Sequence, residues 1–314
     1  MNEKPLISVV MPVYNESIHD LHASINSILN QTYKNFEYII VDDNPNNDQI
    51  KNYIKKRASQ DKRIRLIFNQ RNLKLTKSEN KGIKASKGKY IARMDADDIA
   101  YRNRLKTQLR FIQNNNLDII SSNFSLINDN DELTRKITFN CKNDISNQQK
   151  IKSIIRYGNI AVGPTFMFKK DVFNRIGRYR NFNGEDYDLA VRFLINKNKY
   201  GFESAPLIYK RLRRNSITYH GTLSQYIAER TISRYLRKYD FNKVMPINML
   251  HNMLISLGDK DKCGFRRYAN ARYAYNDNKT YINLLKTIFR ILSSKIVFER
   301  CLWSIFNKYN ISCL

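Results

Sequence analysis

Short apolar runs alternate with segments of helical periodicity from Leu6 to about Ser125. The runs are rich in β-branched residues and favour strands, and the segments between them are long enough for helices. Such alternation is typical of βαβ units on a mainly parallel sheet. We therefore predict a Rossmann-like α/β fold here, with strands at "LISVVMPVY", "FEYIIVDD", "RIRLIFNQ", "KYIARMDADD" and "DIISSNFSLI".

Two of the intervening segments predict helices that cover the sheet. The segment "LTKSENKGIKASKG" ends on Gly88, a residue type that commonly follows the last helical turn. The segment "SIHDLHASINSILNQ" places five apolar residues on one helical stripe, namely Ile18, Leu21, Ile25, Ile28 and Leu29. Each helix would bury one face against the strands.

The pattern changes in the second half of the chain. From about Lys142 to Arg214 it reads as a mixed segment with a helical stretch, the strand-like "TFMFKK" and "FESAPLIYKR", and a loop at "YRNFNGEDYDLAVRF". Residues 222–314 read as mostly helical, and Lys and Arg interrupt their apolar end as in an interfacial helix. We predict one domain over residues 1–215, with halves at 1–98 and 99–215, and a basic helical extension over residues 216–314.

The net charge adds an anionic partner to this picture. The chain has 55 Lys and Arg against 28 Asp and Glu, a formal net charge of +27. Nucleic acid, a membrane surface and a phosphorylated small molecule all fit such a charge, which does not choose between them. The four cysteines lie too far apart for a zinc site or a disulfide scaffold, so we expect free thiols in a reducing cytosol. We expect no membrane-spanning helix, because no apolar run is long enough.

Carboxylates follow two of the predicted strands where each strand ends. Asp42 and Asp43 close one strand, and Asp95, Asp97 and Asp98 close another. Ligands of open α/β sheets bind beyond the carboxyl ends of parallel strands, and like charges gathered there need a compensating cation. A D-x-D pair suits Mg²⁺ or Mn²⁺ completed by water and diphosphate oxygens. The alternative is that these acids only close a strand and cap the next helix.

Two further acidic motifs suggest specific roles. An Asp in "VDDN" could accept the imide N–H of uracil or thymine, or the motif could be a simple turn. In "NGEDYDLAVRF", Glu185, Asp186 and Asp188 precede an apolar helix. One of them could act as a general base, or they could be acids favoured by the helix dipole. The four histidines show no metal-ligand spacing.

The motifs together resemble those of family 2 glycosyltransferases of the GT-A fold, in particular bacterial enzymes that build capsule, O-antigen or lipooligosaccharide chains. The resemblance covers about residues 5–215. It rests on "ISVVMPVYNES", "YIIVDDN", "NKGIKASKGKYIARMDADD" and "GEDYDLAVRF", which occur in the family's order and approximate spacing. It implies a GT-A domain with a nucleotide-binding half at 1–98 and an acceptor half at 99–215.

The resemblance implies roles for the residues that match the nucleotide and metal motifs. Asp43 would recognise uracil. Asp97 would be the direct ligand of Mn²⁺ or Mg²⁺, and Asp95 would lie nearer the ribose and the donor sugar. The edge of the first strand would border the nucleotide through Pro12, Val13, Tyr14 and Glu16.

The remaining implied residues concern catalysis and the diphosphate. Asp186 would be the base of an inverting single displacement, supported by Glu185. Lys74 stands where the family often has glycine, and it or Lys77 would reach the phosphates. Arg211 and His220 would close over the diphosphate, with His220 as a further candidate near the metal.

We therefore expect a metal-dependent inverting hexosyltransferase that moves one sugar from a nucleotide-diphosphate donor, such as a UDP-sugar, to a growing glycan or glycolipid. Its expected location is cytoplasmic and peripheral on the inner face of the cell membrane. The basic extension would bind the anionic membrane surface or form a homodimer, and no nucleic acid is expected. A nucleic-acid-binding protein and a catalytically silent partner subunit are the alternatives.

Overall fold

The computed structural model describes residues 6–137, 143–212, 223–249, 263, 267, 285–287 and 291. The chain divides into two compact units. The first contains Met1–Lys152, Ile160–Asn181 and Glu185–Arg211, and the second contains Ser153–Asn159, Phe182–Gly184 and Leu212–Leu314. All of the sheet lies in the first unit, and the long helix α9 (Leu223–Tyr239) lies in the second.

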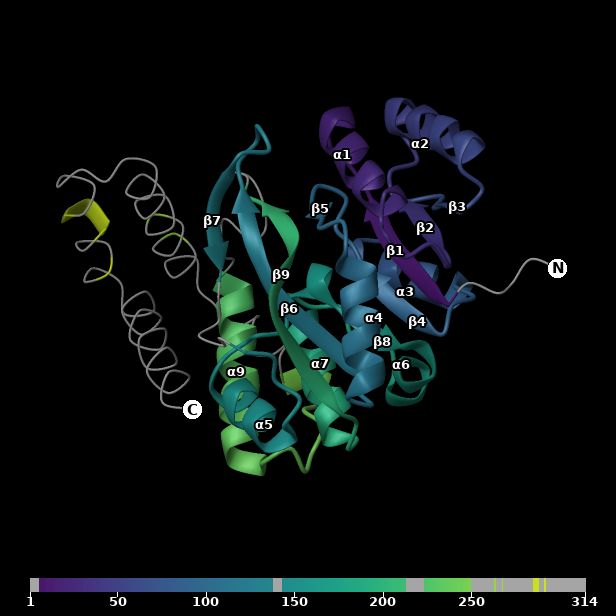
Figure 1. Ribbon diagram of the computed structural model, residues 1–314. Coiled ribbons are helices and arrows are strands. Elements are labelled where there is room, and N and C mark those ends of the chain that lie inside the picture. The colour runs from purple at the N-terminus through teal and green to yellow at the C-terminus, as the bar shows by residue number, and fades with distance from the viewer. Residues whose placement is uncertain are drawn as a thin grey trace. The chain divides into compact units, whose positions relative to one another are not determined.

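A nine-stranded sheet organises the described part of the first unit (Figure 1). Its strand order is β3-β2-β1-β4-β8-β6-β9-β5, and β7 pairs with β6. The strands β1 to β4 are mutually parallel, whereas β8 runs antiparallel to both β4 and β6. The strands are β1 (Ile7–Val13), β2 (Phe36–Asp42), β3 (Ile64–Phe68), β4 (Tyr90–Arg93), β5 (Ile99–Ala100), β6 (Ile119–Ile127), β7 (Leu133–Ile137), β8 (Met167–Lys169) and β9 (Tyr200–Arg211).

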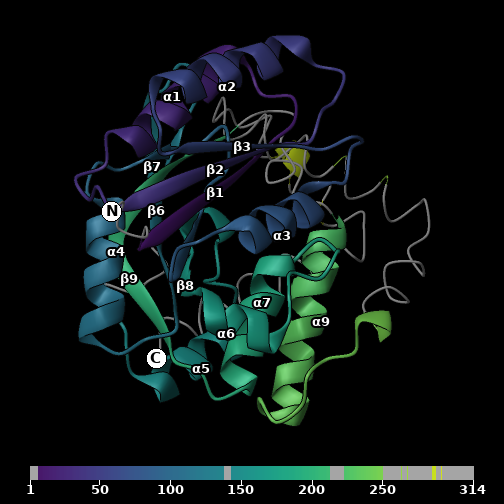
Figure 2. The ribbon, with the colours of Figure 1, turned by 90° about the vertical axis from the view of Figure 1, so that its right-hand side faces the viewer.

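Helices cover both faces of the parallel strands. Figure 2 shows α1 and α2 on one side of β1, β2 and β3, and α3 on the other side. These helices are α1 (Ile18–Leu29), α2 (Asp48–Gln60) and α3 (Leu75–Ala85). The others that begin in the first unit are α4 (Arg104–Asn114), α5 (Gln148–Tyr157), α6 (Lys170–Ile176) and α7 (Glu185–Ile195).

The core lies where β1 and β2 are covered on both faces. Every residue of these two strands is buried, which explains their nearly continuous apolar sequences. Ser17 caps the start of helix α1, because its hydroxyl accepts a hydrogen bond from the backbone N–H of Asp20 at 3.1 Å. Its residues Leu21, Ile25 and Ile28 are fully buried, which confirms the predicted stripe at those positions.

Gly88 does not have the predicted role at the end of α3. The helix ends at Ala85, and Ser86 caps it by donating its hydroxyl to the carbonyl of Ile83 at 2.6 Å. A Cβ at Gly88 would lie 2.6 Å from the backbone nitrogen of Ser8. Gly88 is therefore required by the close approach of β1, and not by a helix end.

The second unit is described mainly through α9. Within it, the hydroxyl of Ser233 donates to the carbonyl of Arg156 at 2.8 Å, and the side chain of Asn159 donates to Glu229 at 3.0 Å. The helical character expected of residues 222–314 is observed in α9, and most of the remainder lies outside the described residues. Within the described part of the chain, no helix is both long and apolar enough to cross a membrane.

Candidate active site

The predicted acidic residues meet at one edge of the sheet. Because β1 is parallel to both β2 and β4, the carboxyl ends of these three strands point the same way. Tyr14 follows β1, Asp43 follows β2, and Asp95 to Asp98 follow β4 within a few residues. This edge is where open α/β sheets bind ligands.

Asp43 is buried and held in a fixed orientation. Its Oδ1 accepts hydrogen bonds from the side-chain amide of Asn69 at 2.7 Å and from the backbone N–H of Leu73 at 2.8 Å. Its backbone N–H donates to the carbonyl of Val13 at 2.8 Å. Within the described part of the chain, the hydrogen bonds of this carboxylate all go to Oδ1, so Oδ2 is the oxygen that could accept a hydrogen bond from the N–H of a nucleobase. Asn69 sets this orientation and was not among the residues predicted from the motifs.

The other residues predicted at the nucleotide edge lie around Asp43. Pro12 and Val13 are buried in β1, whereas the Tyr14 side chain is exposed. The backbone N–H of Tyr14 donates to the Glu16 carboxylate at 2.8 Å, which fixes the turn after β1. Lys77 is exposed in the first turns of α3.

Lys74, just before α3, has a backbone conformation typical of glycine. Its φ is 72° and its ψ is 161°. Only glycine adopts this region readily, and other residues there store about 1–3 kcal/mol of strain. This conformation fits the glycine that the family resemblance implied at this position. The Lys74 side chain is exposed at the same edge as Asp43.

The D-x-D carboxylates are surrounded by cations of the chain itself. Asp95 lies 3.5 Å from Nη2 of Arg93 through one oxygen and 3.5 Å from Nζ of Lys210 through the other. Burial tends to raise the pKa of Asp95, but Arg93 and Lys210 hold it below its usual range. Asp97 is partly exposed.

Asp98 is the buried acid of this segment. Its Oδ1 accepts the backbone N–H of Arg211 at 2.9 Å, and its Oδ2 has no hydrogen-bond partner among the described residues. Burial raises the pKa of Asp98 to about 8. Lys210 lies 3.9 Å from it, and although burial opposes this, Asp98 and Asp95 raise the pKa of the Lys210 ammonium.

Arg93, the last residue of β4, joins carboxylates from three parts of the chain. Its Nε donates to Glu79 on α3, and its Nη1 lies 2.9 Å from Asp186 on α7. Its Nη2 faces Asp95 at 3.5 Å and Glu185 at 3.9 Å. The Arg93 side chain is only 5% exposed, so these four carboxylates take the place of the water molecules that would otherwise solvate its charge.

Asp186 has the surroundings of a poised base. Its two oxygens contact Nη1 of Arg93 at 2.9 and 3.1 Å, and one of them also accepts the backbone N–H of Gly163 at 3.0 Å. Burial raises the pKa of Asp186, while Arg93 opposes the rise. A Cβ at Gly163 would lie 1.2 Å from Nη1 of Arg93, so only glycine leaves room for this contact.

Arg211 has different surroundings from those expected. Its side chain is fully buried, and it donates to the carbonyls of Asp97 at 3.0 Å and Asn128 at 2.8 Å. It also pairs with Asp20 and Asp131. A diphosphate contact would require these bonds to be given up. Neighbouring residues of a strand point to opposite faces of the sheet. Lys210, which precedes Arg211 in β9, therefore points to the other face and contacts Asp95. His220 lies outside the described residues.

Asp95 and Asp97 are the residues that could hold a divalent cation. Among the described residues, carboxyl groups outnumber cationic side chains here: Glu79, Asp95, Asp97, Asp98, Glu185 and Asp186 against Arg93, Arg104 and Lys210. In the described ranges, no three His, Cys, Asp or Glu residues form a metal cage. Two carboxylates completed by water and phosphate oxygens are the arrangement Mg²⁺ commonly adopts.

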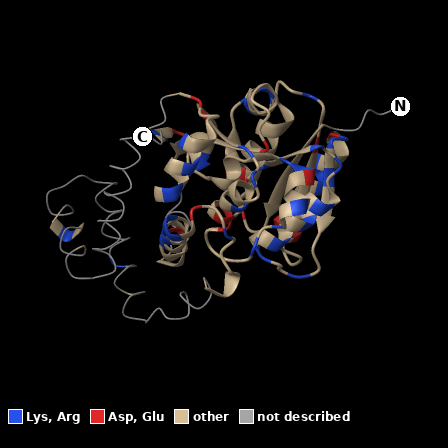
Figure 3. Cartoon of the chain, turned by 90° about the horizontal axis from the view of Figure 1, so that it is seen from below, with Lys and Arg blue, Asp and Glu red and all other residues tan. Residues whose placement is uncertain are grey.

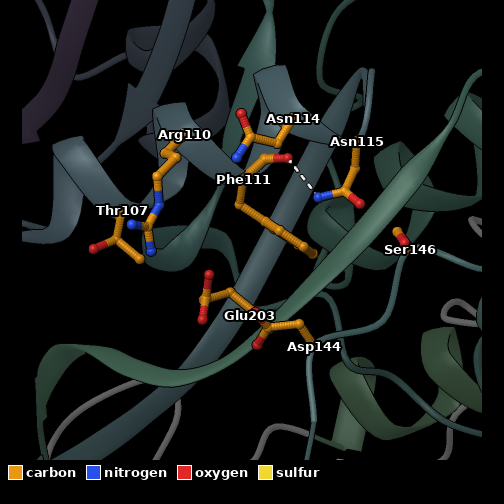
Figure 4. A pocket seen from close by; sticks show the side chains of 8 residues that line it. All are labelled: Thr107, Arg110, Phe111, Asn114, Asn115, Asp144, Ser146 and Glu203. Carbon is orange, nitrogen blue, oxygen red and sulfur yellow. Dashed lines mark hydrogen bonds between the residues drawn. The ribbon is translucent and has the colours of Figure 1, made fainter.

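A separate hollow of about 360 Å³ lies beside α4 and β9 (Figure 4). Its lining includes Arg110, Asp144 and the buried Glu203. Burial and the nearby Asp144 carboxylate raise the pKa of Glu203 to about 7. It contains none of the residues predicted from the motifs, so we place the chemistry at the strand ends.

Comparison with known proteins gives consistent similarities. The family model described as glycosyl transferase family 2 matches residues 8–177. An uncharacterised glycosyltransferase of Methanocaldococcus jannaschii is 38% identical over 204 residues, which cover 63% of this chain and 68% of that protein. The O-antigen biosynthesis glycosyltransferase WbnJ of Escherichia coli is 31% identical over 253 residues, covering 76% and 96%. The E. coli UDP-Glc:alpha-D-GlcNAc-diphosphoundecaprenol beta-1,3-glucosyltransferase WfgD is 34% identical over 140 residues, covering 43% and 54%.

Solved structures share the fold. S. aureus TarS 1-349, in complex with UDP-GlcNAc, gives a TM-score of 0.59 at 15% identity, covering 98% of this chain and 90% of that one. The mannosyltransferase PcManGT of Pyrobaculum calidifontis, in complex with GDP-Man and Mn²⁺, gives 0.58 at 15% identity, covering 99% and 86%. These likenesses confirm the predicted α/β fold of the GT-A type.

Proposed function

The chain belongs to glycosyl transferase family 2, and on that premise we propose that it transfers one sugar from a nucleotide-diphosphate donor to a cell-surface glycan, with inversion at the anomeric carbon. The observation that carries the proposal is the contact of Arg93 with both Asp95 and Asp186. It joins a donor-side carboxylate to a candidate base at one edge of the sheet.

The donor would lie along the carboxyl ends of β1, β2 and β4. The free oxygen of Asp43 would accept the imide N–H of uracil, which favours a UDP-sugar or, with the same imide, a dTDP-sugar. Pro12, Val13, Tyr14 and Glu16 would border the nucleotide, and Lys77 would approach the phosphates. WfgD is named for a UDP-sugar donor and TarS was solved with one, which supports this choice.

Asp95 and Asp97 would hold Mn²⁺ or Mg²⁺ against the diphosphate. The cation supplies positive charge where the departing diphosphate gains negative charge. PcManGT was solved with Mn²⁺, which supports a divalent ion. The excess of carboxyl groups over cationic side chains around Asp95 supports it independently, because a divalent cation would favour their ionised form.

The chain's own residues would carry out the proton transfer. Asp186 takes the proton of the acceptor hydroxyl as that oxygen forms its bond to the anomeric carbon. The bond from that carbon to the diphosphate oxygen breaks, and its electron pair leaves with the diphosphate. Arg93 and Gly163 orient Asp186, and Glu185 lies next to it for contact with the acceptor. The raised pKa of Asp186 lies closer to neutral pH, and a general base is most effective when its pKa is near the pH at which it works.

The names of two relatives support a proposal for the acceptor and the location. WfgD is named for an acceptor on diphosphoundecaprenol and WbnJ for O-antigen biosynthesis, so we propose a lipid-linked glycan at the inner face of the cell membrane. We assign catalysis to residues 1–215, with the nucleotide in 1–98 and the acceptor in 99–215. We assign membrane attachment or dimer formation to residues 216–314.

Calorimetric titration of UDP with and without Mn²⁺ tests this function. We expect micromolar binding that needs the metal and is lost in Asp97→Ala. The exposed Asp129→Ala, on the β6–β7 turn, removes one carboxylate elsewhere and should bind like the wild type. dTDP and GDP serve as comparison nucleotides. Binding of no nucleotide in any condition would contradict the proposal.

A further inference from the structure

The outward face of α3 has one row of lysines and no acidic residue. Lys74, Lys77, Lys81 and Lys84 follow one another at helical spacing, and Lys87 and Lys89 continue the row beyond the helix end. All six are exposed. We call these six residues the lysine stripe. Figure 3 shows Lys and Arg, in blue, crowding the helices nearest the N label.

The opposite face of α3 fixes the stripe in place. Glu79, Gly82 and Ile83 are buried, and a Cβ at Gly82 would lie 2.5 Å from Val10 of β1. The helix cannot turn its lysines inward without losing this contact. The stripe is therefore a permanent feature of this unit's surface.

The stripe is unfavourable for the helix itself. Lysines three or four residues apart on one face repel each other, and lysines in the first turn oppose the helix dipole. Glu79 is the only acid between Asp61 and Asp95, and its carboxylate is buried against Arg93. No acid of α3 therefore compensates the stripe. In the proposed function the donor diphosphate meets Lys77 at one end of the stripe, and an external anionic surface would supply the compensation along the rest.

We propose that the lysine stripe docks onto the anionic surface of a phospholipid bilayer. The stripe consists of lysine alone. The lysine ammonium is a compact point charge on a flexible chain, whereas arginine gives bidentate phosphate recognition. Single-stranded nucleic acid is bound by grooves with several stacking aromatic residues, and Phe68 is the exposed aromatic beside the stripe. A fluid lipid surface fits this composition better than a nucleic acid does.

Two exposed apolar residues support the same partner. Leu75 begins α3 and is 40% exposed, and Phe68 ends β3 and is 39% exposed. Lys81 connects the two elements, because its Nζ donates to the carbonyl of Phe68 at 3.4 Å and to the side-chain oxygen of Asn69 at 2.5 Å. Apolar side chains beside cationic ones suit the boundary between headgroups and acyl chains. This docking face belongs to the first unit and is distinct from the basic extension.

Sedimentation of the full-length protein with vesicles tests the proposal. Lys84→Gln, Lys87→Gln and Lys89→Gln are combined, because these residues lie away from the candidate active site. The matched control combines Lys150→Gln, Lys197→Gln and Lys199→Gln, which removes the same charge from other exposed positions. Vesicles contain phosphatidylcholine alone or phosphatidylcholine mixed with phosphatidylglycerol, and circular dichroism checks folding of each variant.

The stripe variant should lose about a hundredfold in partitioning onto the anionic vesicles, since each lysine near the surface contributes about fivefold. The control should change by less than about threefold, and high salt should weaken binding of the wild type. Equal losses in the two variants would show that only total charge matters and would overturn the proposal. Unchanged binding of the stripe variant, or equally tight binding to neutral vesicles, would overturn it too.

Discussion

Arg93 is the residue on which the proposed chemistry depends most. Its guanidinium contacts Asp186 and Asp95 together, while Glu79 holds its Nε from α3. Burial raises the pKa of Glu79 to about 8 even beside this cation. A single side chain thus contacts both the proposed base and the proposed donor-side carboxylate, and it would act through them as a positioning residue.

Replacing Arg93 should shift the pH dependence of transfer. Burial raises the pKa of Asp186 and Arg93 opposes the rise, so Arg93→Met should raise that pKa further. A base must be ionised, so the acid limb of the profile of kcat/KM against pH should move to higher pH. Arg93→Lys, which keeps the charge, should move it less. A lower rate with an unmoved limb would contradict the assigned role, because it would indicate structural damage only.

At the scale of elements, the parallel half of the sheet was predictable and the antiparallel half was less so. Alternating apolar runs located β1 to β4 and β6, and the acids at their ends marked the edge where Asp43 and Asp95 meet. The run "KYIARM" contains a charged residue inside a buried strand, which was the available signal for Arg93. The pairing of β8 between β4 and β6 and the contacts of Lys210 depend on distant segments, and no local pattern encodes them.

The strand β9 ties the D-x-D segment to the β6–β7 turn through Arg211. Arg211→Met should destabilise the fold by about 3 kcal/mol, because Asp20 would remain buried without its cation. Arg135→Met, on the exposed face of β7, is the control and should change stability by less than about 0.5 kcal/mol. Urea unfolding measures both. A stable Arg211→Met protein with weakened UDP binding would instead support the diphosphate contact expected from the sequence.

At the scale of the whole molecule, several buried acids favour their protonated form. Burial raises the pKa of Glu79 and Asp98 to about 8 and of Glu203 to about 7, and it also raises the pKa of Asp42 and Asp186. A carboxyl group whose pKa is raised by folding stabilises the fold fully at pH values below its pKa in the unfolded state. This contribution is lost as the pH rises through its pKa in the folded state. Acids with a lowered pKa, such as Asp61 and Asp95, change the stability of the fold with pH only at lower pH values.

The midpoint temperature of thermal unfolding should therefore decrease as the pH is raised from 6 to 9. Glu203→Gln removes one of these groups away from the candidate active site and should recover about 1–2 kcal/mol at the alkaline end. The exposed Asp171→Asn should recover nothing. Scanning calorimetry across this range measures the three proteins. A wild-type midpoint that rises with pH, or a Glu203→Gln curve parallel to it, would contradict the assignment.

The backbone of Lys74 has a consequence for engineering this protein. A glycine there would relieve the strain of a conformation that lysine adopts poorly, so a screen for heat resistance would enrich Lys74→Gly. The same exchange would remove an ammonium from the edge of the proposed donor site. Selection for thermal stability and selection for transfer activity would then favour different residues at this position. Directed evolution on thermal stability alone would therefore lower the proposed activity.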